Sequence, residues 1–172
     1  DPIGVVAAIT PWNFPIAIPS WKLMPALIAG NTVVFKPASD TPILAWQLVS
    51  ILEESGLPPG VLNVVFGPGG EIGRALVENP KVALISFTGS TDVGRELGAA
   101  ASARGKRVSL EMGGKNAIIV MDDANLNLAV EGIVWSAFGT TGQRCTAASR
   151  VIAQRGIADR LTDMLVDRAE RL

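Results

Sequence analysis

The sequence predicts an α/β fold: an open, doubly wound parallel sheet with helices on both faces, followed by the beginning of a second α/β domain. Short apolar runs rich in β-branched residues alternate about five times with helical stretches, and the connections are short. Such alternation is typical of a parallel sheet covered by helices on both sides. Hydrophobic residues make up 48% of the 172 residues, and the mean hydropathy is +0.35. The chain can therefore bury a sizeable core.

Each predicted element of the first part has its own local signal. The first apolar run ends in a Thr-Pro-Trp-Asn loop, as a buried parallel strand does. A Pro-Ser pair opens the next helix and a Gly-Asn pair closes it. Asp40 and Thr41 are candidate N-caps for the following helix, and Pro42 suits its first turn. The expected strands are 5–9, 32–35, 61–66, 82–87 and 106–111, and the expected helices are 21–29, 43–54, 71–78 and 91–103.

The pattern changes after the Gly-Gly pair at 113–114, which we take as a domain boundary. The expected domains are therefore 1–114 and 115–172. In the second, strands are expected at 116–121 and 150–154, and helices at 126–138 and from Ile157 onward, where apolar residues recur at helical spacing. The four tryptophans are expected to be packing residues; they are Trp12, Trp21, Trp46 and Trp135.

Composition excludes several classes of function. The net charge is −1, so no broad attraction to nucleic acid or to an anionic membrane is expected. The chain has no histidine and no tyrosine, which leaves no Cys–His dyad, Ser–His–Asp triad or His-ligated metal site, and no metal is expected. A single cysteine excludes an intrachain disulfide and fits a reducing compartment. The start of the chain lacks a signal-peptide pattern, and the apolar stretch 14–29 is interrupted by Lys22 and prolines, so a cytoplasmic protein is expected.

Small and polar residues gather where the predicted strands end. In open parallel sheets, ligands bind beyond the carboxyl ends of the strands. The dinucleotide fingerprint G-x-G-x-x-G is absent, and the Gly-Pro-Gly-Gly stretch at 67–70 fits its spacing poorly, so a nucleotide would bind by another geometry. The clusters at the predicted strand ends are 10–13, 36–39, 67–70, 88–90 and 111–114.

Three side chains could carry chemistry. Cys145, in a loop between Gly142 and Thr146, could attack a carbonyl carbon as a thiolate, although a lone cysteine is more often a small buried residue. Glu111 could act as a general base on water, or be a solvated loop residue. Asn13 could donate to an oxyanion, or bond its own backbone in a turn.

Lys36, Ser39 and Ser90 suggest contacts with a nucleotide. The ammonium of Lys36 and the hydroxyl of Ser39 could hold a ribose or a phosphate, although Lys36 could also be an exposed cation at a strand end. Ser90 could cap the helix that it precedes, and its N–H could contact a pyrophosphate at the same time.

The motifs occur in an order that resembles the NAD(P)-dependent aldehyde dehydrogenase superfamily. The resemblance covers essentially the whole chain and implies a Rossmann-like cofactor domain. It is carried by Thr10-Pro11-Trp12-Asn13-Phe14-Pro15, Lys36-Pro37-Ala38-Ser39, Phe87-Thr88-Gly89-Ser90-Thr91, Leu110-Glu111-Met112-Gly113-Gly114-Lys115 and Gly142-Gln143-Arg144-Cys145.

The resemblance implies a reaction and a set of residues for it. Cys145 would attack the aldehyde, Asn13 and the Cys145 N–H would stabilise the oxyanion, and Glu111 would activate the water that hydrolyses the thioester. Serine at position 39, where NAD-preferring members often have glutamate, implies tolerance of NADP. The implied cofactor-binding residues are Thr10, Pro11, Trp12, Lys36, Ala38, Ser39, Gly67, Gly73, Gly89, Ser90 and Met112.

Full-length members of the superfamily are much longer. By the resemblance, residues 1–114 are an NAD(P)-binding domain that is incomplete at its N-terminus, and residues 115–172 are the first part of the catalytic domain. The parent enzyme would oxidise a small-molecule aldehyde to a carboxylic acid as a homo-oligomer, a dimer or tetramer. A non-catalytic nucleotide-binding module is the alternative. The chain alone is expected to bind cofactor weakly and to turn over little or no aldehyde.

Overall fold

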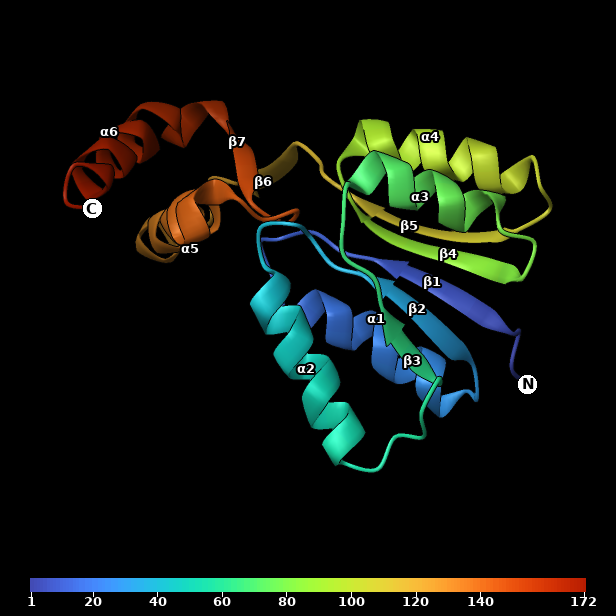
Figure 1. The fold of residues 1–172 in the computed structure, drawn as a ribbon. Helices are drawn as coiled ribbons and strands as arrows, with labels where there is room; N and C mark the ends of the chain where they lie inside the picture. The colour runs from blue at the N-terminus through green and yellow to red at the C-terminus, as the bar shows by residue number, and fades with distance from the viewer. The chain divides into compact units, whose positions relative to one another are not determined.

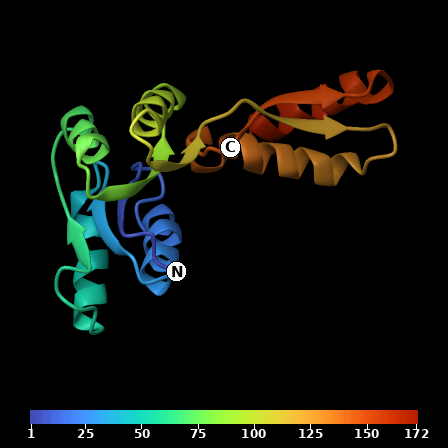
Figure 2. The same ribbon diagram turned by 90° about the vertical axis from the view of Figure 1, so that its right-hand side faces the viewer.

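The computed structural model describes all 172 residues, Asp1–Leu172. The chain divides into two compact units, Asp1–Met112 and Gly113–Leu172. Figures 1 and 2 show helices and strands in both units. The function expected of each unit stays a prediction. No helix combines the length and the apolar character needed to cross a membrane.

The first unit is built on a five-stranded parallel sheet with the order β3-β2-β1-β4-β5. The chain starts in the middle of the sheet, builds outward to one edge and returns to build the other. This is the doubly wound topology that the alternating pattern predicts, and the predicted fold class is confirmed. The strands are β1 (Val5–Ile9), β2 (Thr32–Lys36), β3 (Leu62–Val64), β4 (Val82–Gly89) and β5 (Arg107–Met112).

Helices cover both faces of this sheet (Figure 1). On one face, Ala8 of β1 and Phe35 of β2 pack with Leu23 from the first helix pair. On the other face, Ile9 and Ile85 pack with Val77 from the second pair. The first pair is α1 (Ala17–Ile28) and α2 (Pro42–Glu54), and the second is α3 (Gly69–Glu78) and α4 (Thr91–Ser102). The continuous apolar strands follow from burial on both sides.

Two expectations about this unit need correction. Helix α1 begins at Ala17, ahead of the expected start at residue 21, because Pro19 lies in its first turn, where a missing N–H costs no helical hydrogen bond. The tryptophans do not pack in the interior. Trp12 is 44% exposed, and Trp21, Trp46 and Trp135 are between 58% and 68% exposed on helical surfaces.

The second unit has a two-stranded parallel sheet of β6 and β7, visible again in the turned view of Figure 2. Val120, Val130 and Leu161 belong to a core between this sheet and its helices. Ile119 and Ile152, which face each other across the two strands, are 68% and 51% exposed. The elements are β6 (Asn116–Val120), α5 (Leu126–Phe138), the 3₁₀ turns η1 (Gly139–Gly142) and η2 (Arg155–Ile157), β7 (Ala148–Ala153) and α6 (Ala158–Ala169).

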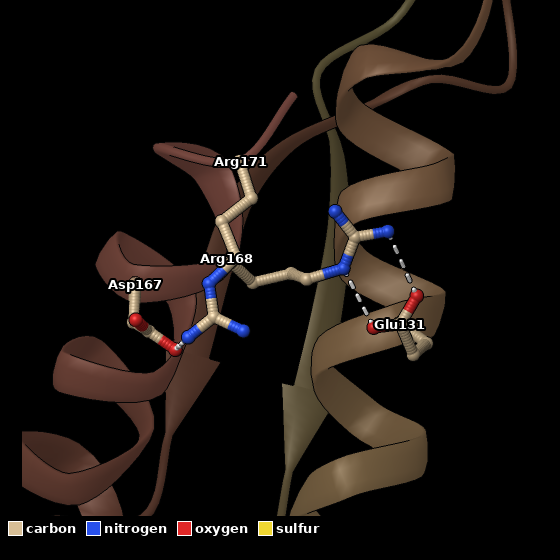
Figure 3. A network of polar contacts seen from close by, with 4 residues as sticks. All are labelled: Glu131, Asp167, Arg168 and Arg171. Carbon is tan, nitrogen blue, oxygen red and sulfur yellow. Dashed lines mark hydrogen bonds and ion pairs between the residues drawn. The ribbon is translucent and has the colours of Figure 1, made fainter.

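Polar contacts connect the two helices of the second unit at their surface (Figure 3). The Arg168 guanidinium on α6 donates from Nε to Glu131 Oε1 at 2.7 Å and from Nη2 to Oε2 at 3.3 Å. This hydrogen bonding lowers the pKa of Glu131. Arg171 pairs with Asp167 one turn earlier. Glu131, Asp167 and Arg171 are exposed and Arg168 is partly exposed, so these pairs contribute less than the core beneath them.

Candidate active site

Several of the predicted cofactor residues lie at the edge of the sheet where its strands end, whereas Gly73 lies within α3. Thr10 follows β1, Lys36 ends β2, Gly89 ends β4 and Met112 ends β5. The carboxyl ends of parallel strands share an edge, so these four positions are neighbours in the fold. Their contact with a cofactor stays a prediction.

Lys36 is the most unusual of these residues because its charged side chain is buried. It is only 5% exposed, and its Nζ donates to the Pro37 carbonyl at 2.9 Å. Burial lowers the pKa of Lys36, and the negative charge of Asp40 acts in the opposite direction. A Cβ built on Gly69, at the start of α3, would lie 3.8 Å from this Nζ. The ammonium therefore lies close to the start of α3, and it has further N–H donors available for a ligand. Because the side chain is buried, the interpretation of Lys36 as an exposed cation is wrong.

A cavity of about 340 Å³ lies between α3 and α4 on the face of the sheet. Most of its wall is apolar, so it suits a flat, largely apolar ring. Its lining includes the uncharged Ile9, Gly70, Val77, Phe87, Val93 and Leu97 and the charged Arg74, Glu78, Glu96 and Arg104. Ser39 is not part of this lining; it is exposed, and its hydroxyl donates to the Gly67 carbonyl at 3.4 Å.

Two predicted glycines have structural reasons for being glycine. Gly67 has a φ of +148°, and a Cβ on it would lie 2.9 Å from the Ile72 side chain. A Cβ on Gly89 would lie 2.5 Å from the Phe87 ring. A side chain at Gly89 would require the Phe87 ring to move, and one at Gly67 would displace the end of Ile72 and adopt a strained backbone conformation. Gly73 is buried where α3 approaches Leu97 of α4.

Ser90 caps helix α4, as predicted. Its hydroxyl oxygen accepts from the Val93 N–H at 3.4 Å. The cap satisfies one of the N–H groups that the start of a helix leaves without a partner. The second predicted role, a pyrophosphate contact, stays a prediction.

Asn13 and Glu111 both belong to the first unit. Asn13 lies in the loop between β1 and α1 and is partly buried. Glu111 is exposed near the end of β5, in register with Thr88 of β4. Both residues therefore lie in the region where the strands end.

Sequence reasoning missed Lys22, which points from α1 toward the sheet. Its Nζ donates to the hydroxyl of Ser86 on β4 at 3.1 Å. Burial lowers the pKa of Lys22, whereas the charge of Glu111 raises it. A cation thus lies within electrostatic reach of the predicted base. The sequence contains a signal for this position, because Lys22 is the one charged residue in the apolar stretch 14–29, and a charge in such a stretch indicates a specific polar partner.

Cys145 belongs to the second unit. It follows α5 and the 3₁₀ turn η1, and its thiol is free and exposed. The interpretation of Cys145 as a small buried residue is therefore wrong, and its predicted position in a loop is confirmed. Asn116 of β6 donates from Nδ2 to the Cys145 carbonyl at 2.7 Å and to the Ala147 carbonyl at 3.2 Å. That Cys145 meets Asn13 and Glu111 in one site stays a prediction.

Comparison with known proteins gives consistent matches. A family model described as "Aldehyde dehydrogenase family" matches residues 1–172. The chain is 52% identical over 169 residues to the alpha-ketoglutaric semialdehyde dehydrogenase of Bacillus subtilis, covering 98% of this chain and 35% of that protein. It is 52% identical over 172 residues to the alpha-ketoglutarate semialdehyde dehydrogenase of Haloferax volcanii, covering 100% of this chain and 36% of that protein.

Solved structures agree with the sequence matches. The NAD-dependent aldehyde dehydrogenase from Sinorhizobium meliloti superposes with a TM-score of 0.97 at 43% identity, covering 100% of this chain and 34% of that one. An NADP-dependent enzyme of E. coli gives a TM-score of 0.96 at 48% identity, covering 99% of this chain and 36% of that one.

These matches identify the class of protein as α/β with a Rossmann-like domain. More particularly, the chain belongs to the aldehyde dehydrogenase family, as its motifs imply. The matched solved structures include an NAD-dependent enzyme, an NADP-dependent enzyme and one complex with nicotinamide adenine dinucleotide, which agrees with the cofactor class expected from the motifs. The chain spans about a third of the length of these relatives.

Proposed function

We propose that this chain supplies the cofactor cleft and the nucleophile of an enzyme that oxidises an aldehyde to a carboxylic acid with NAD(P)⁺. One observation carries the proposal: in a family member matched over all 172 residues, the single cysteine has a free, exposed thiol in a loop. A thiol there is accessible to a substrate, whereas a buried one is not.

Residues of the first unit fit a dinucleotide. The buried Lys36 ammonium has donors left for ribose hydroxyls, and the apolar cavity between α3 and α4 suits an adenine ring. The side chain at position 39 is a neutral serine, so no carboxylate at that position repels a 2′-phosphate. We therefore infer that the enzyme accepts NADP as well as NAD, which parallel titrations with the two cofactors would test.

The proposed chemistry begins at Cys145. Its thiolate sulfur forms a bond to the aldehyde carbon, and the carbonyl oxygen becomes an oxyanion that the Asn13 amide and the Cys145 N–H stabilise. An oxidised nicotinamide dinucleotide, held by residues such as Lys36, would supply the hydride acceptor. Loss of the hydride leaves a thioester on Cys145. Glu111 then takes a proton from water as the water oxygen attacks the acyl carbon, the carbon–sulfur bond breaks, and the acid leaves as the thiolate is restored.

The substrate class we infer is a semialdehyde that carries a carboxylate at its far end. Two relatives at 52% identity are named for alpha-ketoglutaric semialdehyde, and a third, from Saccharolobus solfataricus, is a 2,5-dioxopentanoate dehydrogenase at 47% identity. A phenylacetaldehyde dehydrogenase is equally similar at 52% over 156 residues. A comparison of kcat/KM for a carboxylated and an uncharged aldehyde of equal length would decide between these classes.

Cys145→Ala tests the nucleophile. In the protein produced from the complete open reading frame, we expect turnover to fall at least about a thousand-fold, because the covalent route is lost. Affinity for NAD should stay within about two-fold, since the cofactor residues lie in the other unit. A variant that still turned over would overturn the proposed mechanism. A wild-type protein that bound cofactor without any turnover would favour the nucleotide-binding module.

A further inference from the structure

The loop that presents Cys145 has an unusual backbone. Thr140 and Thr141, in the turn directly after α5, have φ values of 54° and 52°. Residues other than glycine rarely adopt this left-handed conformation, because the Cβ crowds the backbone, and it persists only where the surroundings hold it. Something in the second unit must therefore hold the loop in place.

Arg144, the residue before the nucleophile, holds the loop against the end of α5. Its Nη2 donates to the carbonyls of Trp135 at 2.6 Å and Ser136 at 3.1 Å. These carbonyls belong to the last turn of α5, where the helix dipole is negative; the Trp135 carbonyl also accepts from the Gly139 N–H. The guanidinium also lies over the Trp135 ring, 4.1 Å from its centroid, as a cation–π contact does. The exposed tryptophan thus has a function within its own unit.

Two glycines leave room for this contact. A Cβ on Gly139 would lie 2.9 Å from Arg144 Nη2. Gly142 has a φ of +70°, and a Cβ on it would lie 2.8 Å from the Ala137 carbonyl oxygen. The Gly-Thr-Thr-Gly turn and the guanidinium therefore fit together.

Asn116 holds the main chain on the C-terminal side of the Cys145 loop. Its Nδ2 bonds the carbonyls of Cys145 and Ala147, so the main chain is anchored to β6 immediately after the point where Arg144 anchors it to α5. Cys145 lies between the two anchors. Its N–H and its sulfur can then keep one orientation relative to the second unit.

We propose that Arg144 is a positioning residue for Cys145, and that Asn116 is its counterpart on the other side of the loop. The inference rests on the proposed function, since it gives these residues a role in presenting the nucleophile. A misplacement of about 1 Å can cost a hundred-fold in rate, so the loss should appear in kcat. Two carbonyls and an aromatic face already engage the guanidinium, which argues against its binding a substrate carboxylate.

The test compares Arg144→Ala, Arg144→Lys and the control Arg160→Ala in the complete protein. Arg160 is exposed on α6 and forms no ion pair. We expect Arg144→Ala to lower kcat about 10- to 100-fold with KM for the aldehyde within about three-fold. Arg144→Lys should restore part of kcat, because it keeps a cation over Trp135 but loses the planar donor group. Arg160→Ala should match the wild type.

The rate of iodoacetamide modification, followed by mass spectrometry of the Cys145 peptide, is a readout that needs no turnover. We expect it to change at least about three-fold in Arg144→Ala and to stay unchanged in Arg160→Ala. If Arg144→Ala does not fold, Asn116→Asp removes the second donor at constant shape and should lower kcat in the same way.

Three results would overturn the inference. One is an unchanged kcat and modification rate in folded Arg144→Ala and Asn116→Asp. Another is a rise in KM confined to carboxylated aldehydes, because the guanidinium would then bind substrate. The third is an equal loss in Arg160→Ala. Turnover retained by Cys145→Ala would instead contradict the proposed function, so the two failures are distinguishable.

Discussion

The two units of this chain cover a parallel sheet to different extents. In the first unit helices pack on both faces, and Ala8 and Ile85 are completely buried. In the second unit α5 and α6 pack with Val120 on one face, and Ile119 and Ile152 remain exposed. Parallel sheets are normally buried on both faces. Within these 172 residues, the first unit therefore has a core on each side of its sheet, whereas the second has a core on one side.

The units also present functional residues in different ways. In the first, the predicted cofactor residues follow strands, so the sheet itself brings them to one edge. In the second, the nucleophile lies in a loop after a helix, and Arg144 and Asn116 hold that loop through hydrogen bonds. Substitutions in the first unit should therefore affect the positions of its functional residues through the packing of the core. Substitutions near Cys145 should affect the position of the nucleophile through the hydrogen bonds of its loop.

The largest expected change in stability comes from shortening a buried isoleucine on a strand of the first unit. An exposed isoleucine on a strand of the second unit is the matched control. Ile85→Ala should destabilise the first unit by about 2–5 kcal/mol, because it leaves a cavity where the wild-type residue is 0% exposed. Ile119→Ala should change the stability of the second unit by less than about 0.5 kcal/mol, because its side chain is 68% exposed. Hydrogen exchange of the β4 and β6 amides would measure each unit separately. Similar losses in the two variants would contradict the comparison.

Helical glycines should respond in opposite directions. Gly94→Ala in α4 should destabilise by about 1–3 kcal/mol, because its Cβ would meet the Met112 sulfur at 2.6 Å and the Phe87 ring at 3.1 Å. Gly132→Ala in α5 meets nothing within 4 Å and should stabilise by about 0.5–1 kcal/mol through helix propensity. The same exchange measurement on the two helices checks both. A stabilising Gly94→Ala would show that α4 does not pack closely against β5.

The smallest effect is expected at the surface pair of the second unit. Glu131→Gln removes the carboxylate that Arg168 bonds (Figure 3). Because the folded-state pKa of Glu131 is lowered, its contribution is present above the unfolded pKa of about 4.3 and is lost as the pH falls through the folded value. Melting temperatures at pH 7 should differ slightly between the variant and the wild type. The difference should shrink as the pH falls below the unfolded pKa and should vanish in 1 M salt; one that survived in salt would indicate a contribution other than the ion pair.

Most of the first unit was predictable from local signals. Continuous β-branched runs identified β1 and β4 because burial on both faces removes polar residues from such strands. The boundaries were less predictable. Strand β3 is limited to Leu62–Val64, shorter than the apolar run 61–66, because pairing with β2 and not composition decides where a strand ends.

The candidate site was predictable in part. Cys145, Glu111 and Lys36 stand out by type and by position after predicted elements. Lys22 and Arg144 did not receive a role, because the partners that distinguish them are distant in sequence or are main-chain carbonyls. Ser86, which accepts from Lys22, is 64 residues away, and the carbonyls that Arg144 bonds belong to residues of every type.

By itself, the sequence determined the α/β class, the order of strands and helices, the family and the side chains able to carry the chemistry, because periodicity, turn residues and motifs are local properties of the chain. The folded chain alone shows that Lys36 is buried and that Trp135 supports Arg144. These features depend on which distant groups meet, since burial and hydrogen bonding arise only when the chain is folded.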